Sequence, residues 1–224
     1  MSLAKRAAAE GIGTAFLVAA VVGSGIMGER LSDENPAVTL LANSLATGGA
    51  LVALILAFGA ISGAHFNPVV SLVARMRREL AGGETLAYVA MQVVGGLAGV
   101  AAAHLMFGEP MFSPSRHARA GTAQLFSECV ATFGLVAVIL GCSRARPVAI
   151  PYAVAAYITS AYWFTASTSF ANPAVTLARS LTDSFSGIRP SDLVPFVAAQ
   201  VTGGLLAAKV FAWLQHPALG SPDK

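Results

Sequence analysis

The residues best suited to do chemistry lie in two short stretches, Ser62-Gly-Ala-His-Phe-Asn-Pro-Val-Val-Ser-Leu72 and Ser169-Phe-Ala-Asn-Pro-Ala-Val-Thr-Leu177. Asparagine can cap a helix, and proline suits the first helical position because its missing N–H would be unpaired there. We therefore expect one short helix to begin at Asn67-Pro68 and another at Asn172-Pro173. At membrane depth, broken polar backbone is tolerated only where it is buried in protein or lines a wet cavity. Such stretches at matching positions in two halves of a membrane protein would mark a conduction site.

The composition indicates an integral membrane protein. Of 224 residues, 55% are hydrophobic and 11% are charged, against roughly a quarter charged in soluble domains. The formal net charge is +3, and no basic patch with interleaved aromatic residues indicates nucleic-acid binding. A membrane-spanning helix needs about 20 apolar residues, and six spans are expected, at 7–28, 37–60, 84–107, 122–143, 147–166 and 191–214. We interpret the first span as a retained helix, because it lacks a clear signal-peptide cleavage site.

The two halves of the chain resemble each other. Glu10 and Thr14 in the first span match Glu128 and Thr132 in the fourth, and Gln92-Val-Val-Gly-Gly96 matches Gln200-Val-Thr-Gly-Gly204. We divide the chain into a first repeat, 1–110, and a second repeat, 118–216. Three spans per repeat make the second repeat inverted in the membrane. The predicted fold is all-α, with six transmembrane helices and two re-entrant half-helices.

The loop charges predict the orientation. One set of loops contains Lys5, Arg6, Arg75, Arg77, Arg78, Arg144 and Arg146, whereas acidic residues offset the arginines of the other set. An excess of Lys and Arg places a loop in the cytoplasm, so both termini of this multi-pass inner-membrane protein are expected there. We call Asn67-Pro-Val69 and Asn172-Pro-Ala174 the first and second box. Asn35-Pro-Ala-Val-Thr-Leu40 has the same six residues as Asn172-Pro-Ala-Val-Thr-Leu177 but runs into a full span, so we expect it to be a loop and the first helical turn.

The sequence gives no reason to expect an enzyme. It contains no nucleophile–base set, no phosphate-binding loop and no metal-ligand cluster, so neither a cofactor nor a metal is predicted. Cys129 and Cys142 are the two cysteines, and a structural disulfide between them is not expected.

Taken together, these motifs resemble the aquaporin and aquaglyceroporin family. The resemblance implies a homotetramer in the lipid bilayer, with one pore per subunit for water and small neutral solutes. It also implies that the half-helices meet at mid-membrane, where Asn67 and Asn172 donate hydrogen bonds to a passing oxygen atom. The backbone before the boxes would line the pore with carbonyl groups, at Gly63, Ala64, His65, Phe66, Thr168, Phe170 and Ala171. Ala174 keeps the family's third box residue, whereas Val69 replaces it and is expected to alter the contact between the two Asn-Pro turns.

Two buried carboxylates allow two interpretations. By resemblance, Glu10 and Glu128 anchor the backbone N–H groups of the re-entrant loops, which we favour. The alternative is a proton relay in a secondary transporter. His65 is expected to face the pore or hold its turn, with pH gating as a further alternative. Tyr162 and Trp163 are expected in the lipid belt rather than at the pore mouth.

The selectivity filter departs from the family pattern. The position after the second box usually holds an arginine and is Val175 here; counting without gaps adds Thr47, Ser160 and Ser169. Arg179 could lean toward the outer mouth, but we favour an interfacial or subunit-contact role. Opposite the carbonyls an apolar wall is expected, with Val52, Leu56 and Val154 as candidates.

Such a filter predicts a wide channel for neutral polyhydroxylated solutes. Glycerol-like polyols and undissociated acids of arsenic, antimony or boron are candidates. Arg-less filters of this kind look similar to those of bacterial aquaglyceroporins associated with arsenic resistance. A water-selective aquaporin and an ion-coupled secondary transporter are the alternatives.

Overall fold

The computed structural model describes residues 1–215 and is entirely helical over that range apart from turns and loops. The end of the second predicted repeat, residue 216, lies outside the described residues. The helices are α1 (Leu3–Leu31), α2 (Pro36–Ser62), α3 (Pro68–Met76), α4 (Gly82–Phe107), α5 (Thr122–Ala145), η1 (Pro147–Ala149), α6 (Ile150–Phe164), α7 (Pro173–Arg179), η2 (Pro190–Asp192) and α8 (Leu193–Leu214).

Five helical segments of the described chain are long and apolar enough to cross a membrane: Leu3–Leu31, Pro36–Ser62, Gly82–Phe107, Thr122–Ala145 and Pro190–Leu214. The remaining predicted span, 147–166, forms a 3₁₀ turn followed by α6, which has 15 residues. Pro147 and Pro151 lie at the starts of these two helices, where a missing N–H breaks no helical hydrogen bond. The predicted all-α membrane fold with two short half-helices is therefore confirmed.

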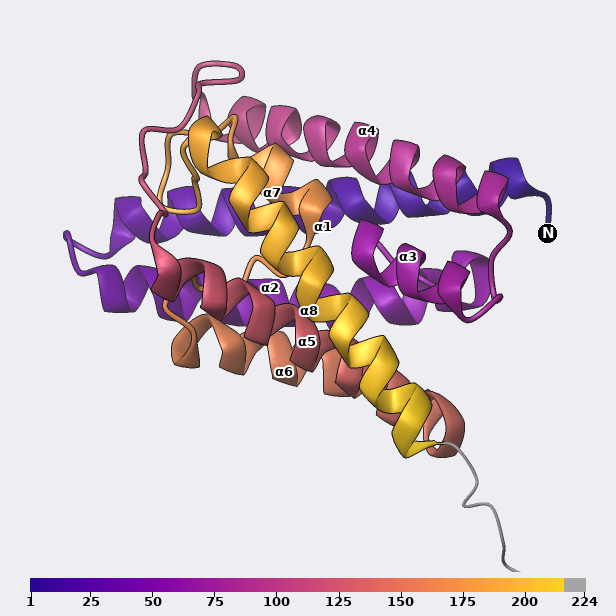
Figure 1. Cartoon of the computed structure of the whole chain (residues 1–224). Helices are drawn as coiled ribbons and strands as arrows, with labels where there is room; N and C mark the ends of the chain where they lie inside the picture. Colours follow the sequence, from indigo (N-terminus) through magenta and orange to yellow (C-terminus); the bar gives the residue numbers. More distant parts are fainter. Residues whose placement is uncertain (216–224) are drawn as a thin grey trace, which may run out of the picture.

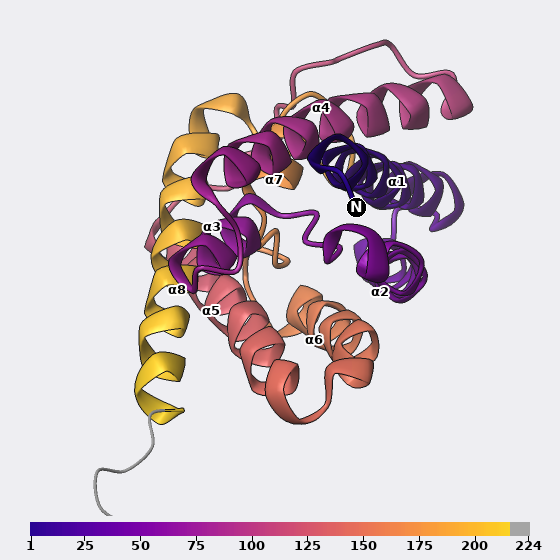
Figure 2. The same cartoon turned by 90° about the vertical axis from the view of Figure 1, so that its right-hand side faces the viewer.

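The long helices surround the two short ones. Helix α1 packs against α2 and α4, α5 packs against α6 and α8, and α2 contacts α6. Seen from the end, the loops before α3 and α7 enter the middle of the bundle (Figure 2). α3 and α7 run toward opposite ends of the bundle, and α1 begins on the side where α8 ends (Figure 1).

Glycines allow the closest helix contacts. A Cβ atom on Gly95 would lie 2.1 Å from the carbonyl oxygen of Gly11, and one on Gly203 would lie 2.2 Å from that of Cys129. Small residues let helix backbones approach in this way in lipid. α4 is thereby held tightly on α1, and α8 on α5.

Asparagine caps three of the helices. Asn67 and Asn172 begin α3 and α7, and each side chain accepts hydrogen bonds from backbone N–H groups of the first turn. Asn35 does the same for α2, where it is exposed and leads into a full-length helix, as predicted. The same Asn-Pro motif therefore begins a re-entrant helix or a spanning helix, depending on the residues that precede it.

Candidate functional site

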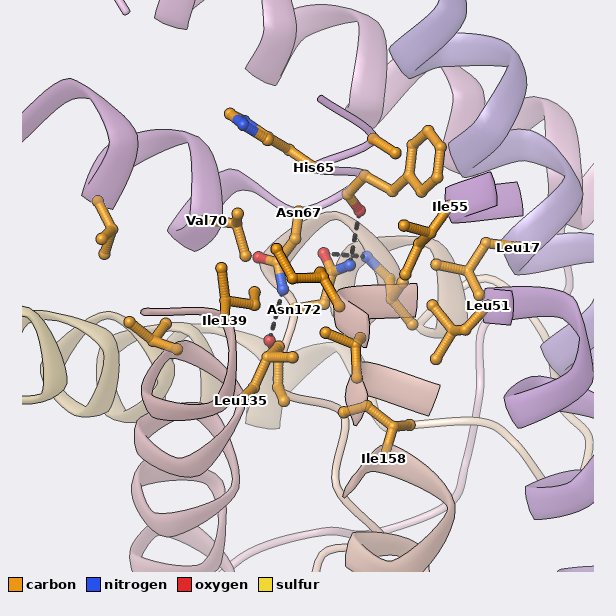
Figure 3. A pocket seen from close by; sticks show the side chains of 18 of the residues that line it. Leu17, Leu51, Ile55, His65, Asn67, Val70, Leu135, Ile139, Ile158 and Asn172 are labelled. Atoms are coloured by element: carbon orange, nitrogen blue, oxygen red, sulfur yellow. Dashed lines mark hydrogen bonds between the residues drawn. The ribbon is translucent and has the colours of Figure 1, made fainter. Parts of the chain in front are cut away.

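The two Asn-Pro turns are joined by a reciprocal pair of hydrogen bonds. The Nδ2 group of Asn67 donates to the carbonyl of Ala171 at 2.8 Å, and that of Asn172 donates to the carbonyl of Phe66 at 2.7 Å. Figure 3 shows both asparagines side by side at the cavity, surrounded by apolar side chains. An amide NH₂ carries two hydrogens, so each asparagine keeps one for a molecule in the cavity.

The backbone before each asparagine follows the same unusual path. Counting back from either asparagine, the fourth, third and first residues have positive φ. These residues are Gly63, Ala64 and Phe66 in one loop and Thr168, Ser169 and Ala171 in the other. A left-handed conformation costs a residue with a side chain about 1–3 kcal/mol and tends to occur at functional sites.

This path leaves a row of carbonyl groups free in each loop. Among the described residues no hydrogen bond reaches the carbonyl oxygens of 63–65 or of 168–170. All the predicted backbone positions line the cavity except Thr168, which lies beside the lining residue Ser169. The strained loops can therefore present hydrogen-bond acceptors to a solute.

Glu10 fastens the first loop. One carboxylate oxygen accepts hydrogen bonds from the N–H of His65 at 3.0 Å and the hydroxyl of Ser62 at 2.6 Å. The other accepts from the N–H of Phe66 at 2.7 Å and the side chain of Gln92 at 2.8 Å. These are the bonds that the anchoring role requires.

Glu128 fastens the second loop in the same way. It accepts from the N–H groups of Phe170 and Ala171, both at 2.9 Å, and from Gln200 at 2.6 Å. The two glutamines were visible in the repeat comparison, but their role was missed. Each also donates to a hydroxyl on its half-helix, Gln92 to Ser71 and Gln200 to Thr176, so each ties a loop carboxylate to a re-entrant helix.

His65 lines the cavity and also holds its turn. Its Nδ1 atom is 3.1 Å from the hydroxyl of Ser71, and its ring packs edge-on against Tyr88, with centroids 5.5 Å apart. His65 therefore both faces the cavity and holds its turn.

The wall facing the loops is apolar. Val154 lines the cavity as predicted, but Val52 and Leu56 do not. On α2 the apolar lining residues are Leu51 and Ile55, one position earlier, and about 100° of helical rotation per residue moves Leu56 to the exposed surface. The rest of the wall comes from Leu17, Val21, Leu135, Ile139, Ile150 and Ile158.

We call the end of the cavity beside α7 the outer mouth. Thr47, Ser169 and Val175 line the cavity, as expected for filter residues. Ser160 does not: it is exposed on α6, and its hydroxyl donates to the carbonyl of Ala156. The prediction for Ser160 is wrong because a gap-free count fixes a distance along the chain, not the face of a helix.

Tyr162 occupies that place instead. It is buried, lines the cavity, and its hydroxyl lies 3.1 Å from that of Thr47. It follows Val154 and Ile158 at helical spacing, which is the signal that would have found it. The lipid-belt prediction is therefore wrong for Tyr162, whereas Trp163 is half exposed.

Arg179 does not take the interfacial or subunit-contact position that we favoured from the sequence. Its side chain is 1% exposed and lines the cavity, with its guanidinium carbon 3.3 Å from the centre of the Phe170 ring. Its Nε group donates to the carbonyl of Ser186. Arg179 is therefore neither interfacial nor available for a contact between subunits.

A second buried arginine, Arg119, was missed because it lies in the connection between α4 and α5. Its guanidinium donates to the carbonyls of Gly187, Ser167 and Phe185 at 2.8, 3.3 and 3.1 Å, which clamps the outer loops together. Burial lowers the pKa of Arg119 to about 10, so it remains charged at neutral pH.

The side chain of Val69 packs toward α8. It is buried among Val73, Val136 and Leu140, and its Cγ1 atom would lie 2.2 Å from a Cβ atom on Gly204. The extra volume relative to alanine is therefore accommodated beside Gly204 of α8.

Comparisons with known proteins identify the family of this chain. The profile of the family described as Major intrinsic protein matches residues 1–149. Aquaglyceroporin AqpS from Rhizobium meliloti (strain 1021) is 54% identical over 216 residues, covering 96% of this chain and 92% of its own. The probable aquaporin AqpM from Archaeoglobus fulgidus is 30% identical, covering 96% and 97%.

A solved structure shares the fold. The X-ray structure of the aquaglyceroporin from Plasmodium falciparum superposes with a TM-score of 0.74 at 18% identity, covering 94% of this chain and 96% of that one. Together with the profile match and the sequence relatives, the joined Asn-Pro boxes lead to one conclusion. This chain is a membrane channel protein of the major intrinsic protein family.

Proposed function

We propose that the chain is a passive channel for water and small neutral solutes, including glycerol-like polyols and undissociated metalloid acids such as arsenite. The observation that carries this proposal is the set of side chains at the outer mouth. Directly after the second box stands Val175, and three of the residues that line the same cavity, Thr47, Ser169 and Tyr162, are neutral and carry hydroxyl groups.

Neutral hydroxyl groups suit neutral polyols. They can replace part of the solute's hydration shell by donating and accepting hydrogen bonds, while the apolar wall limits how many bonds form at once. The 54% identical relative named as an aquaglyceroporin supports the polyol part of the proposal. The metalloid part rests on the similar size and hydroxyl pattern of these uncharged acids.

Proton coupling is disfavoured by the bonding of the two buried carboxylates. Glu10 and Glu128 accept hydrogen bonds at both oxygens from loop N–H groups and a glutamine. In Glu10 each oxygen accepts two hydrogen bonds, so taking up a proton would break one of them. We infer that both act as anchors and that transport is passive.

The setting in the membrane follows from charge and symmetry. We infer that both termini face the cytoplasm across the inner membrane, because the loops on that side contain the excess of Lys and Arg. We also infer a homotetramer with one pore in each subunit, which chemical crosslinking in native membranes would test.

The test is stopped-flow light scattering on reconstituted vesicles with water, glycerol and arsenite gradients. The wild type is expected to admit all three. Val175→Arg and Thr47→Phe should narrow the outer mouth and reduce solute entry by about tenfold or more, with less effect on water. Met111→Arg is the matched control, because Met111 is an exposed loop residue outside the cavity.

Two results would contradict the proposal. Fast water entry without solute entry in the wild type would identify a water-selective channel. Unchanged solute entry in both Val175→Arg and Thr47→Phe would place the constriction elsewhere.

A further inference from the structure

The guanidinium group of Arg179 has most of its hydrogen-bonding capacity unused. A guanidinium carries five N–H donors, and Arg179 uses the one on Nε for the carbonyl of Ser186. Within residues 1–215 neither Nη atom has a hydrogen-bond partner, and the ion pairs there do not include Arg179. A buried charge is expensive unless it is paired or hydrated, so these donors need a partner from the cavity that Arg179 lines.

The position of this group is fixed from several sides. The centre of the Phe170 ring lies 3.3 Å from the Arg179 Cζ atom, and Phe170 is itself held by the hydrogen bond from its N–H to Glu128. The Ser186 hydroxyl belongs to a hydrogen-bonded series that runs from His104 to Thr182 at 2.9 Å, then to Ser184 at 3.0 Å and Ser186 at 3.2 Å. This series holds the loop segment 182–186 in place, and the carbonyl of Ser186 in that segment accepts the hydrogen bond from Arg179 Nε.

The cavity supplies complementary groups close to Arg179. Val175 lies one helical turn before it, so both side chains are on the same face of α7. The hydroxyl of Ser169, the residue before Phe170, is buried and has no hydrogen-bond partner in the described chain. An unpartnered hydroxyl and a guanidinium with two unpartnered Nη groups therefore line the same end of the cavity.

The other buried arginine does not share this role. The guanidinium carbon of Arg119 lies 5.0 Å from the Phe170 ring centre, and its N–H groups donate to three backbone carbonyls. It does not line the cavity. The N–H donors of Arg119 are used by the loop carbonyls. Arg119 therefore supports the loops of the outer mouth, whereas Arg179 faces the cavity.

We propose that Arg179 supplies the fixed positive charge of the outer mouth that the residue after the second box, Val175, lacks. It thereby excludes cations and, together with Ser169, binds the hydroxyl groups of a solute. The Arg179 side chain then reaches into the constriction from one turn further along α7. This leaves more room beside Val175 than an arginine at position 175 would. This refines the proposed function, but its test does not depend on glycerol transport.

The experiment measures cation entry into vesicles containing Arg179→Met. Uptake of methylammonium is followed in slightly acidic buffer, where the amine is charged, and water permeability is measured on the same vesicles. The wild type is expected to exclude methylammonium. Arg179→Met should conduct water at least as fast and admit methylammonium about tenfold faster.

Two further variants separate charge from folding. Val175→Arg combined with Arg179→Met moves the arginine back by one turn and should restore cation exclusion. Arg30→Met is the matched control: it removes an exposed arginine paired with Glu109, away from the cavity, and should leave cation entry unchanged. If Arg179→Met does not fold, Arg179→Lys and Arg179→Gln replace it, with exclusion expected for lysine and leakage for glutamine.

The proposal is overturned if water conduction is retained and methylammonium entry stays within twofold of the wild type in Arg179→Met, or in Arg179→Gln. Leakage in both Arg179→Lys and Arg30→Met would also overturn it, because the effect would not then report the charge at position 179. Failure of the wild type to conduct glycerol would contradict the proposed function while leaving this result intact.

Discussion

Asn67 and Asn172 each donate a hydrogen bond to the carbonyl group that precedes the other asparagine in its own loop. The two bonds are equivalent under the internal repeat, although they join residues more than 100 positions apart. The same side chains cap α3 and α7 through their oxygen atoms. One amide thus caps a helix, crosslinks the halves and keeps a donor for the cavity.

Replacing either pore asparagine by aspartate should be damaging. In Asn172→Asp a carboxylate oxygen would face the carbonyl of Phe66, which loses a hydrogen bond and buries a charge without a partner. We expect a loss of about 2–4 kcal/mol in the free energy of unfolding, together with loss of water conduction. Thermal unfolding in detergent and stopped-flow scattering measure the two effects.

The chain contains its own control for that substitution. Asn35 begins the same six-residue word, but it is exposed and caps α2. Aspartate caps a helix as well as asparagine does, so Asn35→Asp should leave both stability and conduction unchanged. Equal effects of Asn35→Asp and Asn172→Asp would show that capping alone explains the second box.

Glu128→Gln should loosen the second re-entrant loop. The new NH₂ group would point at one of the N–H groups of Phe170 and Ala171, leaving a buried donor unpaired at a cost of about 1–3 kcal/mol. Glu109→Gln removes an exposed ion pair with Arg30 and should cost less than about 1 kcal/mol. The difference in melting temperature between the two variants checks this, and equal melting temperatures would refute the anchoring role.

Val69 and Gly204 should be coupled energetically. Gly204→Ala places a methyl group 2.2 Å from Val69 Cγ1, and overpacking of this kind costs about 1–3 kcal/mol. Adding Val69→Ala should recover most of that loss. A double-mutant cycle from unfolding curves measures the coupling, and Gly59→Ala, where nothing lies within 4 Å, is the uncoupled control. Additive effects of Val69→Ala and Gly204→Ala would argue against this packing.

Two serines distinguish the constriction seen in the structure from the one predicted by counting residues from the boxes. Ser169 lines the cavity and Ser160 faces outward from α6. Ser169→Phe should therefore reduce glycerol entry by about tenfold or more, while Ser160→Phe leaves it unchanged. Reduced entry in Ser160→Phe alone would support the filter counted from the sequence.

The sequence predicts what local chemistry determines. Asn-Pro at the start of a half-helix and apolar runs of spanning length each act over a few residues, so the fold and the boxes could be read directly. The repeat even pairs Glu10 with Glu128. Which face of α2 or α6 lines the cavity depends instead on packing. The expectation was one position off on α2, where Leu51 and Ile55 line the cavity, and two positions off on α6, where Tyr162 does.

Arg179 shows why part of the outer mouth could not be predicted from the sequence. Its neighbours along α7 indicate only that it shares a face with Val175. Its burial depends on the Phe170 ring, on a carbonyl at Ser186 and on loops clamped by Arg119, all set by tertiary structure. No local pattern distinguishes such an arginine from one at the surface of the membrane.

The reciprocal bonding of the asparagines also has a consequence for biogenesis. The chain is made from its N-terminus, so α1 to α4 exist before residue 171 has been synthesised. Until then Asn67 lacks its acceptor, and Phe66 lacks the donor that its carbonyl will receive. The central passage is therefore completed late, by docking of the second half, and a newly inserted first half cannot leak through a pore that does not yet exist.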